Sequence, residues 1–156
     1  MGNLKLTSSD FSDGDEIPRE CGYKNGNRAP RLKWNLLDAF SGLGYWPASF
    51  ALIMDDPDAM EAVGKVWVHW VVWNIPTKQN KIPQEHTVDG AEGMTDFGKV
   101  GYGGPAPPDK RHTYVFKLYA LDIYLDLPGK STKADVEKAM EGHIIEQTQL
   151  TGTYAP

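Results

Sequence analysis

Three apolar runs rich in β-branched and aromatic residues restrict the fold of this 156-residue chain more than any other feature. Their sequences are SFALIMD (49–55), WVHWVVWNIP (67–76) and RHTYVFKLYALD (111–122). Such residues favour β-strands, and the side chains of the third run alternate with the period of two that a strand requires. The glycines and prolines of DFGKVGYGGPAPPDK (96–110) exclude regular structure just before it. The chain is therefore predicted to be built mainly from strands.

Shorter elements complete this prediction. They are strands at 4–7, 31–34 and 148–154, a loop or short helical turn at 35–48, a polar, turn-rich segment from about 77 to 95, and one helix from Thr132 to about Ile145. Thr132 and Asp135 form a capping-box-like pair at the start of this helix. Many short strands with a single well-formed helix predict an antiparallel β-sandwich or barrel. We expect an all-β fold with one or two short peripheral helices, in one domain that spans residues 1–156.

Composition excludes several classes of protein. The formal net charge is -5 and no basic run occurs, which argues against a nucleic-acid partner, since such proteins need basic stripes to neutralise phosphates. Cys21 is the only cysteine, so no internal disulfide and no CxxC pair can form. The N-terminal segment lacks the apolar core of a signal peptide, and no apolar run is long enough to span a bilayer. A cytoplasmic protein that is not inserted into a membrane is expected.

Polar groups lie where the three long strands begin or end. Asp56 and Asp58 follow the first strand, His69 lies within the second, and His112 opens the third. Strand alternation predicts three sets of side chains that each share one face: Phe50, Leu52, Met54 and Asp56; Trp67, His69, Val71 and Trp73; and His112, Tyr114, Phe116 and Leu118. Because sandwiches place their sites at strand ends, these polar groups are candidates for one site.

Each polar group also has a structural interpretation. Asp56-Pro57-Asp58 is typical of a turn, because Asp side chains bond to nearby backbone and Pro restricts φ. His69 could be a core histidine paired with a carbonyl or carboxylate, and His112 a solvated start of a strand. The GxGxxA spacing from Gly101 is not a dinucleotide fingerprint, since the prolines at 105, 107 and 108 prevent the helix that it must open. What remains is a glycine-rich loop whose backbone N–H groups could face an anion.

Several ordered motifs together resemble the phosphatidylethanolamine-binding proteins, the family of Raf kinase inhibitor protein. The motifs are DPDA, the strand that contains HW and ends in NIP, and GYGGPAPP followed by HTYVFKLYALD. LTSSDFSDGDEIP near the start and EGHIIEQTQLTGTY near the close are similar to the compact prokaryotic branch. The resemblance runs nearly end to end, and it implies a β-sandwich with a small anion pocket near the surface.

Carried over residue by residue, the resemblance implies a ligand-binding set of Asp56, Asp58, Trp67, His69, Gly104, Pro105, His112 and Tyr114. The carboxylates are expected to accept N–H bonds from the histidines and so to favour imidazolium, whose donors would face a phosphate-like group with the Tyr114 hydroxyl. Several features depart from the family, among them Met60 in place of a second proline and a short loop from Pro108 to His112. Thr113 stands where the family has Arg, with Arg111 just before His112, and the connection at 38–48 is longer than usual.

The resemblance implies a ligand-binding or regulatory protein for a small anionic or phosphorylated ligand: a phospholipid headgroup, a nucleotide or a phosphorylated partner. It implies no catalytic residue, metal or cofactor. Inhibition of a protein kinase or protease belongs to the family as a whole, and the sequence leaves a homodimer open. Two alternatives come from other classes. One is a hydrolase with Asp56 or a histidine as general base, and the other is a zinc site built from the two histidines and the carboxylates.

Overall fold

The computed structural model describes residues 2–82 and 89–156, so residues 83–88 of the predicted turn-rich segment lie outside the described residues. The elements are β1 (Leu6–Thr7), a 3-10 helix η1 (Arg19–Cys21), β2 (Leu32–Trp34), α1 (Leu36–Phe40), β3 (Ser49–Asp56), α2 (Ala59–Val63), β4 (Trp67–Pro76), β5 (Lys81–Ile82), β6 (Ala91–Glu92), β7 (His112–Leu121), α3 (Lys133–Met140) and β8 (Ile144–Tyr154). The described helices are short and all the long elements are strands.

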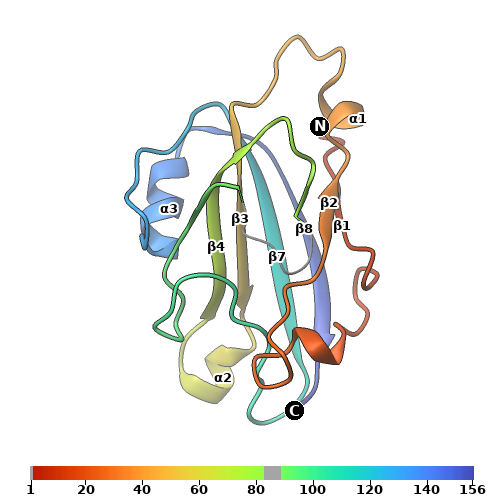
Figure 1. Ribbon diagram of the computed structural model, residues 1–156, viewed down its shortest axis with the longest axis vertical. Coiled ribbons are helices and arrows are strands. Elements are labelled where there is room, and N and C mark those ends of the chain that lie inside the picture. Colours follow the sequence, from red (N-terminus) through yellow and green to blue (C-terminus); the bar gives the residue numbers. More distant parts are fainter. Residues whose placement is uncertain (1, 83–88) are drawn as a thin grey trace.

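The strands form two antiparallel sheets, which confirms the predicted all-β sandwich. The larger sheet has the order β6-β4-β3-β7-β8, and the smaller has the order β1-β2-β5. Figure 1 shows the small sheet against one face of the large one, with α3 against the opposite face. None of the described helices is both long and apolar enough to cross a membrane.

Strand alternation divides the apolar side chains between two cores. The main core lies between the sheets and includes Phe50, Leu52 and Met54 of β3 and Tyr114, Phe116 and Leu118 of β7. The second core lies under α3 and takes the other face of the large sheet, with Ala51, Ile53, Val71, Trp73, Val136 and Met140. The faces predicted for β3 and β7 are confirmed.

The face predicted for β4 is wrong because the strand contains an irregularity at His69. Met54 pairs with Trp70 and Asp55 with Val68, so His69 is an extra residue between these pairs. A bulge of this kind reverses the alternation beyond it. Trp67 and His69 therefore lie on the side of the main core, whereas Val71 and Trp73 of the same predicted set face α3.

The helices also differ from the prediction. The capping box of Thr132 and Asp135 is present, but α3 ends at Met140, five residues before the predicted end. Gly142 has a φ of 78°, a left-handed conformation that ends the helix, and β8 then begins at Ile144. α1 forms within the segment expected to be a loop or helical turn, and α2 was not predicted.

Candidate functional site

A small cavity lies at the end of the large sheet where β3 ends and β4 and β7 begin. Its volume is about 180 Å³. Asp56, Trp67 and His112 come together there because antiparallel strands bring the end of one beside the starts of its neighbours. The lining residues are Asp56, Ala59, Ala62, Val63, Trp67, His69, Phe97, Ala106, Pro108 and His112. Figure 1 shows α2, which forms one wall, at this end of the sheet.

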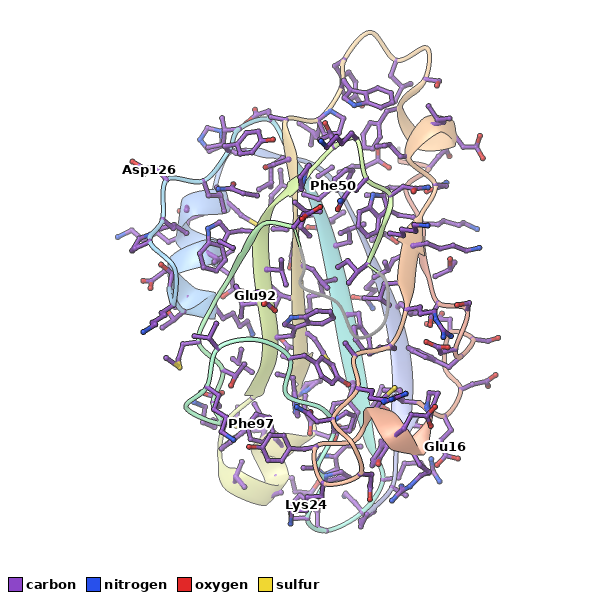
Figure 2. The ribbon with its side chains drawn as sticks, viewed as in Figure 1. Glu16, Lys24, Phe50, Glu92, Phe97 and Asp126 are labelled. Carbon is purple, nitrogen blue, oxygen red and sulfur yellow. The ribbon has the colours of Figure 1, made fainter. Side chains whose placement is uncertain are left out.

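The walls are largely apolar, and aromatic contacts hold them. The Phe97 ring stacks on Tyr23 with a centroid distance of 4.0 Å and meets the Trp67 ring edge-on at 5.7 Å. Figure 2 places Phe97 at the same end of the molecule as α2. Pockets for drug-sized molecules usually measure roughly 300–1,000 Å³. The cavity is smaller than such pockets.

His112 is held between two carboxylates. Its Nδ1 lies 2.6 Å from Asp56 Oδ2, its Nε2 lies 2.7 Å from Asp109 Oδ1, and its side chain is fully buried. Burial opposes the charged ring, but the hydrogen bonds and charges of the two carboxylates outweigh burial, so the pKa of His112 is raised. The hydrogen bond to Asp56 agrees with the prediction from the sequence. The hydrogen bond to Asp109 was not predicted.

Asp56 has a second task at this end of β3. Its Oδ1 accepts the backbone N–H of Ala59 at 3.2 Å, which attaches the first turn of α2 to the strand. Asp56 is 3% exposed. One buried carboxylate thus orients the His112 ring and places the α2 wall of the cavity.

His69 differs from the expectation of two charged histidines. Its Nδ1 lies 2.6 Å from the carbonyl oxygen of Gly103, and the side chain is buried. Burial lowers the pKa of His69, and this effect exceeds the opposing influence of the Gly103 carbonyl and the nearby Asp56 charge. A carbonyl oxygen can only accept, so Nδ1 carries the proton, and Nε2 of the neutral ring is an acceptor.

Tyr114 has a buried hydroxyl without a hydrogen-bond partner among residues 2–82 and 89–156. The hydroxyl lies near Asp56 and the backbone of Ala106, but no contact has hydrogen-bond geometry. Its ring packs edge-on against His69 and is tilted against His112, with centroid distances of 5.2 and 6.3 Å. Burial, followed by the charge of Asp56, raises the pKa of Tyr114, so the hydroxyl keeps its proton as a donor.

Of the predicted ligand-binding residues, Asp58, Gly104, Pro105 and Tyr114 are not among the residues that line the cavity. Asp58 accepts the backbone N–H of Thr113 at 2.8 Å and has no bond to a histidine, which corrects the expected pairing. Its role is to attach the start of β7 to the turn after β3. The predicted use of glycine-loop N–H groups is also corrected, because the Gly104 N–H donates to Asn27 Oδ1 at 2.7 Å.

The conformation of the glycine-rich loop follows from close packing on the chain near η1. A Cβ on Gly104 would lie 1.9 Å from the carbonyl oxygen of Cys21, so only glycine fits there. The Pro105 carbonyl accepts the N–H of Tyr23 at 2.9 Å. These contacts fix the loop, and the loop in turn presents the Gly103 carbonyl to His69.

Asp109, Phe97 and the α2 residues of the wall were missed in the sequence. Asp109 and Phe97 lie in segments without periodicity, so no alternation or helical spacing connects them to the strands. The separation of three residues between Asp109 and His112 was the one local signal that could have suggested their contact. In the part of the chain that the structure describes, no group of three or more His, Cys, Asp or Glu side chains could hold a metal ion.

The chain forms a two-sheet antiparallel sandwich with a small cavity at one end of its strands. This architecture is a ligand-binding fold. The sequence model of the family described as phosphatidylethanolamine-binding protein matches residues 7–155. The chain belongs to this family.

Relatives and solved structures agree with this assignment. A UPF0098 protein of Methanothermobacter thermautotrophicus is 40% identical over 157 residues, which cover 97% of this chain and 98% of the relative. A crystal structure of a phosphatidylethanolamine-binding protein homologue from Chlamydia trachomatis has a TM-score of 0.85 and 33% identity, covering 97% of this chain and 96% of that one. Escherichia coli YbcL has a TM-score of 0.83 and 30% identity, covering 97% of both chains.

Proposed function

We propose that the cavity binds a small oxoanion, the phosphate-bearing group of a lipid headgroup, nucleotide or phosphorylated partner. The observation that carries this proposal is the raised-pKa ring of His112 on the cavity wall, together with the Tyr114 hydroxyl, which is buried, protonated and without a partner in the described chain. Tyr114 does not line the cavity itself, but its ring contacts the lining residues His69 and His112. A buried donor without a partner is costly and calls for an explanation. The described chain has two others, Trp34 Nε1 and Trp73 Nε1, but only the Tyr114 hydroxyl belongs to a ring that contacts both histidines of the cavity.

The polar groups have complementary parts in this binding. His112 supplies the positive charge, oriented by Asp56, and Tyr114 donates a hydrogen bond to an anionic oxygen. His69 Nε2 accepts, so it suits an oxygen of the ligand that still carries a proton. Dihydrogen phosphate and a monoprotonated phosphomonoester, which are both monoanions, offer both kinds of oxygen, and they are the ligand forms that fit this set best.

Apolar walls strengthen this recognition. Trp67 and Phe97 exclude water from one side of the cavity, and charged hydrogen bonds are stronger where the local dielectric is low. The same rings can contact the carbon atoms that follow the phosphate. The description of the Chlamydia trachomatis homologue supports a phosphatidylethanolamine-like headgroup as one source of such a group. Inhibition of a kinase or protease would require a further surface around the pocket.

Isothermal titration of the protein with inorganic phosphate and with phosphoethanolamine tests the proposal. His112→Ala should weaken binding by tenfold or more, on the order of the loss of a charged hydrogen bond. His143→Ala is the matched control, because His143 lies on the surface and bonds to Asp122. Equal affinity of folded His112→Ala and the wild type would refute the site.

A turnover assay separates binding from the hydrolase alternative. The lining residues include no Ser, Thr or Cys that could act as a nucleophile. The lining groups that could act as a general base are Asp56, His69 and His112, and of these Asp56 and both nitrogens of His112 are already hydrogen-bonded. We therefore expect no hydrolysis of phosphomonoesters, and turnover that disappears in Asp56→Asn would favour the enzyme instead.

A further inference from the structure

Asp109 occupies the position on His112 that an anionic ligand would need. The ring has two nitrogens, and Asp56 and Asp109 each bond to one of them, at 2.6 and 2.7 Å. Because both nitrogens of the ring are hydrogen-bonded, His112 has no further N–H to offer. A ligand oxygen can reach the charged ring only if one carboxylate leaves.

The two carboxylates differ in how firmly they are held. Asp56 belongs to β3, its side chain is 4% exposed, and its second oxygen accepts the N–H of Ala59. Asp109 lies in the irregular segment before β7, and its side chain is 38% exposed. Water can replace His112 as the partner of Asp109, whereas the release of Asp56 would also detach α2. Asp109 is therefore the carboxylate that can be displaced.

We propose that Asp109 is an internal competitor, a carboxylate that mimics the ligand on His112 and is displaced when an anion binds. This inference rests on the proposed function. It makes Asp109 a specificity-determining residue, since only an anion that bonds to His112 better than a carboxylate can take its place.

The competition also sets the charge that the site accepts. With Asp109 in place, one imidazolium lies between two carboxylates, and this cluster already carries an excess negative charge. Exchange of Asp109 for a monoanion keeps that balance at the ring, whereas a dianion adds a charge beside Asp56. Lys110 compensates little, because its ammonium group pairs with Glu61 at 3.1 Å on the surface. The site should favour monoanionic oxoanions.

Removal of the Asp109 carboxylate tests the proposal. Inorganic phosphate is titrated calorimetrically at about pH 5.5, where an ordinary histidine is charged and loss of Asp109 does not deprotonate His112. Asp109→Ala should bind phosphate roughly tenfold to a hundredfold more tightly than the wild type, because a bond to a charged group no longer competes. Asp109→Asn keeps an acceptor oxygen but loses the charge, so its affinity for phosphate should lie between those of the wild type and Asp109→Ala.

Glu61→Gln is the matched control. It removes a negative charge close to the α2 wall without touching His112. It also releases Lys110, but both side chains are exposed and their charges are screened, so the affinity should change by less than about twofold. A comparable gain in Glu61→Gln would overturn the proposal, since the effect would then be general electrostatics.

The outcomes distinguish this inference from the proposed function. If the wild type binds phosphate, His112→Ala does not, and Asp109→Ala binds equally or more weakly, the anion site stands and the competitor role is refuted. If neither the wild type nor Asp109→Ala binds phosphate while both melt as folded proteins, the anion site itself is refuted, and the inference falls with it.

Discussion

Replacement of Tyr114 by Phe should separate binding from stability, because its hydroxyl is buried without a partner in the described residues. A buried polar group that lacks a hydrogen bond costs roughly 1–3 kcal/mol. Removing only that oxygen keeps the ring that packs against His69. We therefore expect the free energy of unfolding of Tyr114→Phe to be unchanged or higher by up to about 2 kcal/mol.

Tyr154 provides an internal comparison for the same substitution. It is 2% exposed, and its hydroxyl donates to the Arg19 carbonyl oxygen at 2.7 Å and accepts from Asn25 Nδ2 at 2.6 Å. Tyr154→Phe leaves both partners unsatisfied, so it should lower the free energy of unfolding by about 1–3 kcal/mol. Identical chemistry should thus have opposite effects on stability at the two positions.

The two variants should differ in the opposite way in their affinity for phosphate. Tyr114→Phe should weaken phosphate binding by roughly tenfold to a hundredfold, the value of one hydrogen bond to a charged group, while Tyr154→Phe should bind like the wild type. Urea denaturation and calorimetric titration of the three proteins measure both quantities. If Tyr114→Phe is destabilised as much as Tyr154→Phe, its hydroxyl has a structural partner, and the reasoning that reserves it for a ligand is refuted.

Three further predictions use other parts of the structure. Affinity for a sulfonate, whose charge is constant, should fall as pH rises through the raised pKa of His112, above the ordinary value of about 6.5, because the imidazolium is lost; a flat profile in calorimetry between about pH 5.5 and 9 would contradict this. Asp55→Asn should lower stability to urea by about 1–3 kcal/mol without changing phosphate affinity, because Asp55 is paired with Lys117 and Lys133 on the α3 side of the sheet; weaker binding would refute that separation. Gly104→Ala should lower the melting temperature, by overpacking worth at least about 1–3 kcal/mol, whereas Gly129→Ala, with open space around it, should not; equal melting temperatures would contradict the close approach to Cys21.

The pH prediction has a counterpart in stability. A raised pKa in the folded state means that the charged His112 ring stabilises the fold. This stabilisation is fully present below the unfolded value of about 6.5 and is lost as pH rises through the folded pKa. His69 acts in the opposite sense, because its lowered pKa favours the neutral ring. Both the free energy of unfolding and the affinity for a sulfonate should therefore fall as pH rises above the pKa of His112 in the folded protein.

The strands β3, β4 and β7 could be predicted from the sequence because burial on both faces of a sheet imposes a local composition. β8 begins at Ile144, inside the predicted helix, and only its second half was predicted as a strand. Alternation also gave the correct faces for β3 and β7, since these strands pair in continuous register from Ser49 with Leu121 to Asp55 with Val115. It failed in β4, where the irregularity at His69 adds one residue. A bulge leaves no mark in the hydrophobic pattern itself, so the reversal beyond His69 could not be predicted from alternation.

For the two histidines, the position in the fold could be predicted from the sequence but the charge could not. Sequence and family resemblance suggested that His69 and His112 lie in one site, and the structure places both on the wall of one cavity. Their charges could not be predicted, because they depend on partners far away in the chain. His69 faces a carbonyl 34 residues away, and His112 faces a carboxylate 56 residues away. Two residues of one type therefore differ in the direction of their pKa shifts.

Asp109 shows why loops limit such predictions most. The strands are constrained by pairing with their neighbours, whereas the segment before β7 is constrained mainly by its two ends and its prolines. Its short path from Pro108 to His112 brings the Asp109 carboxylate onto the ring, and a longer connection would free that carboxylate to face solvent. In the proposed competition for His112, loop length at this position would set how readily Asp109 is displaced, without altering the buried pair of Asp56 and His112. Selectivity for an anion would then vary through the loop, while the sandwich and its charged histidine stay the same.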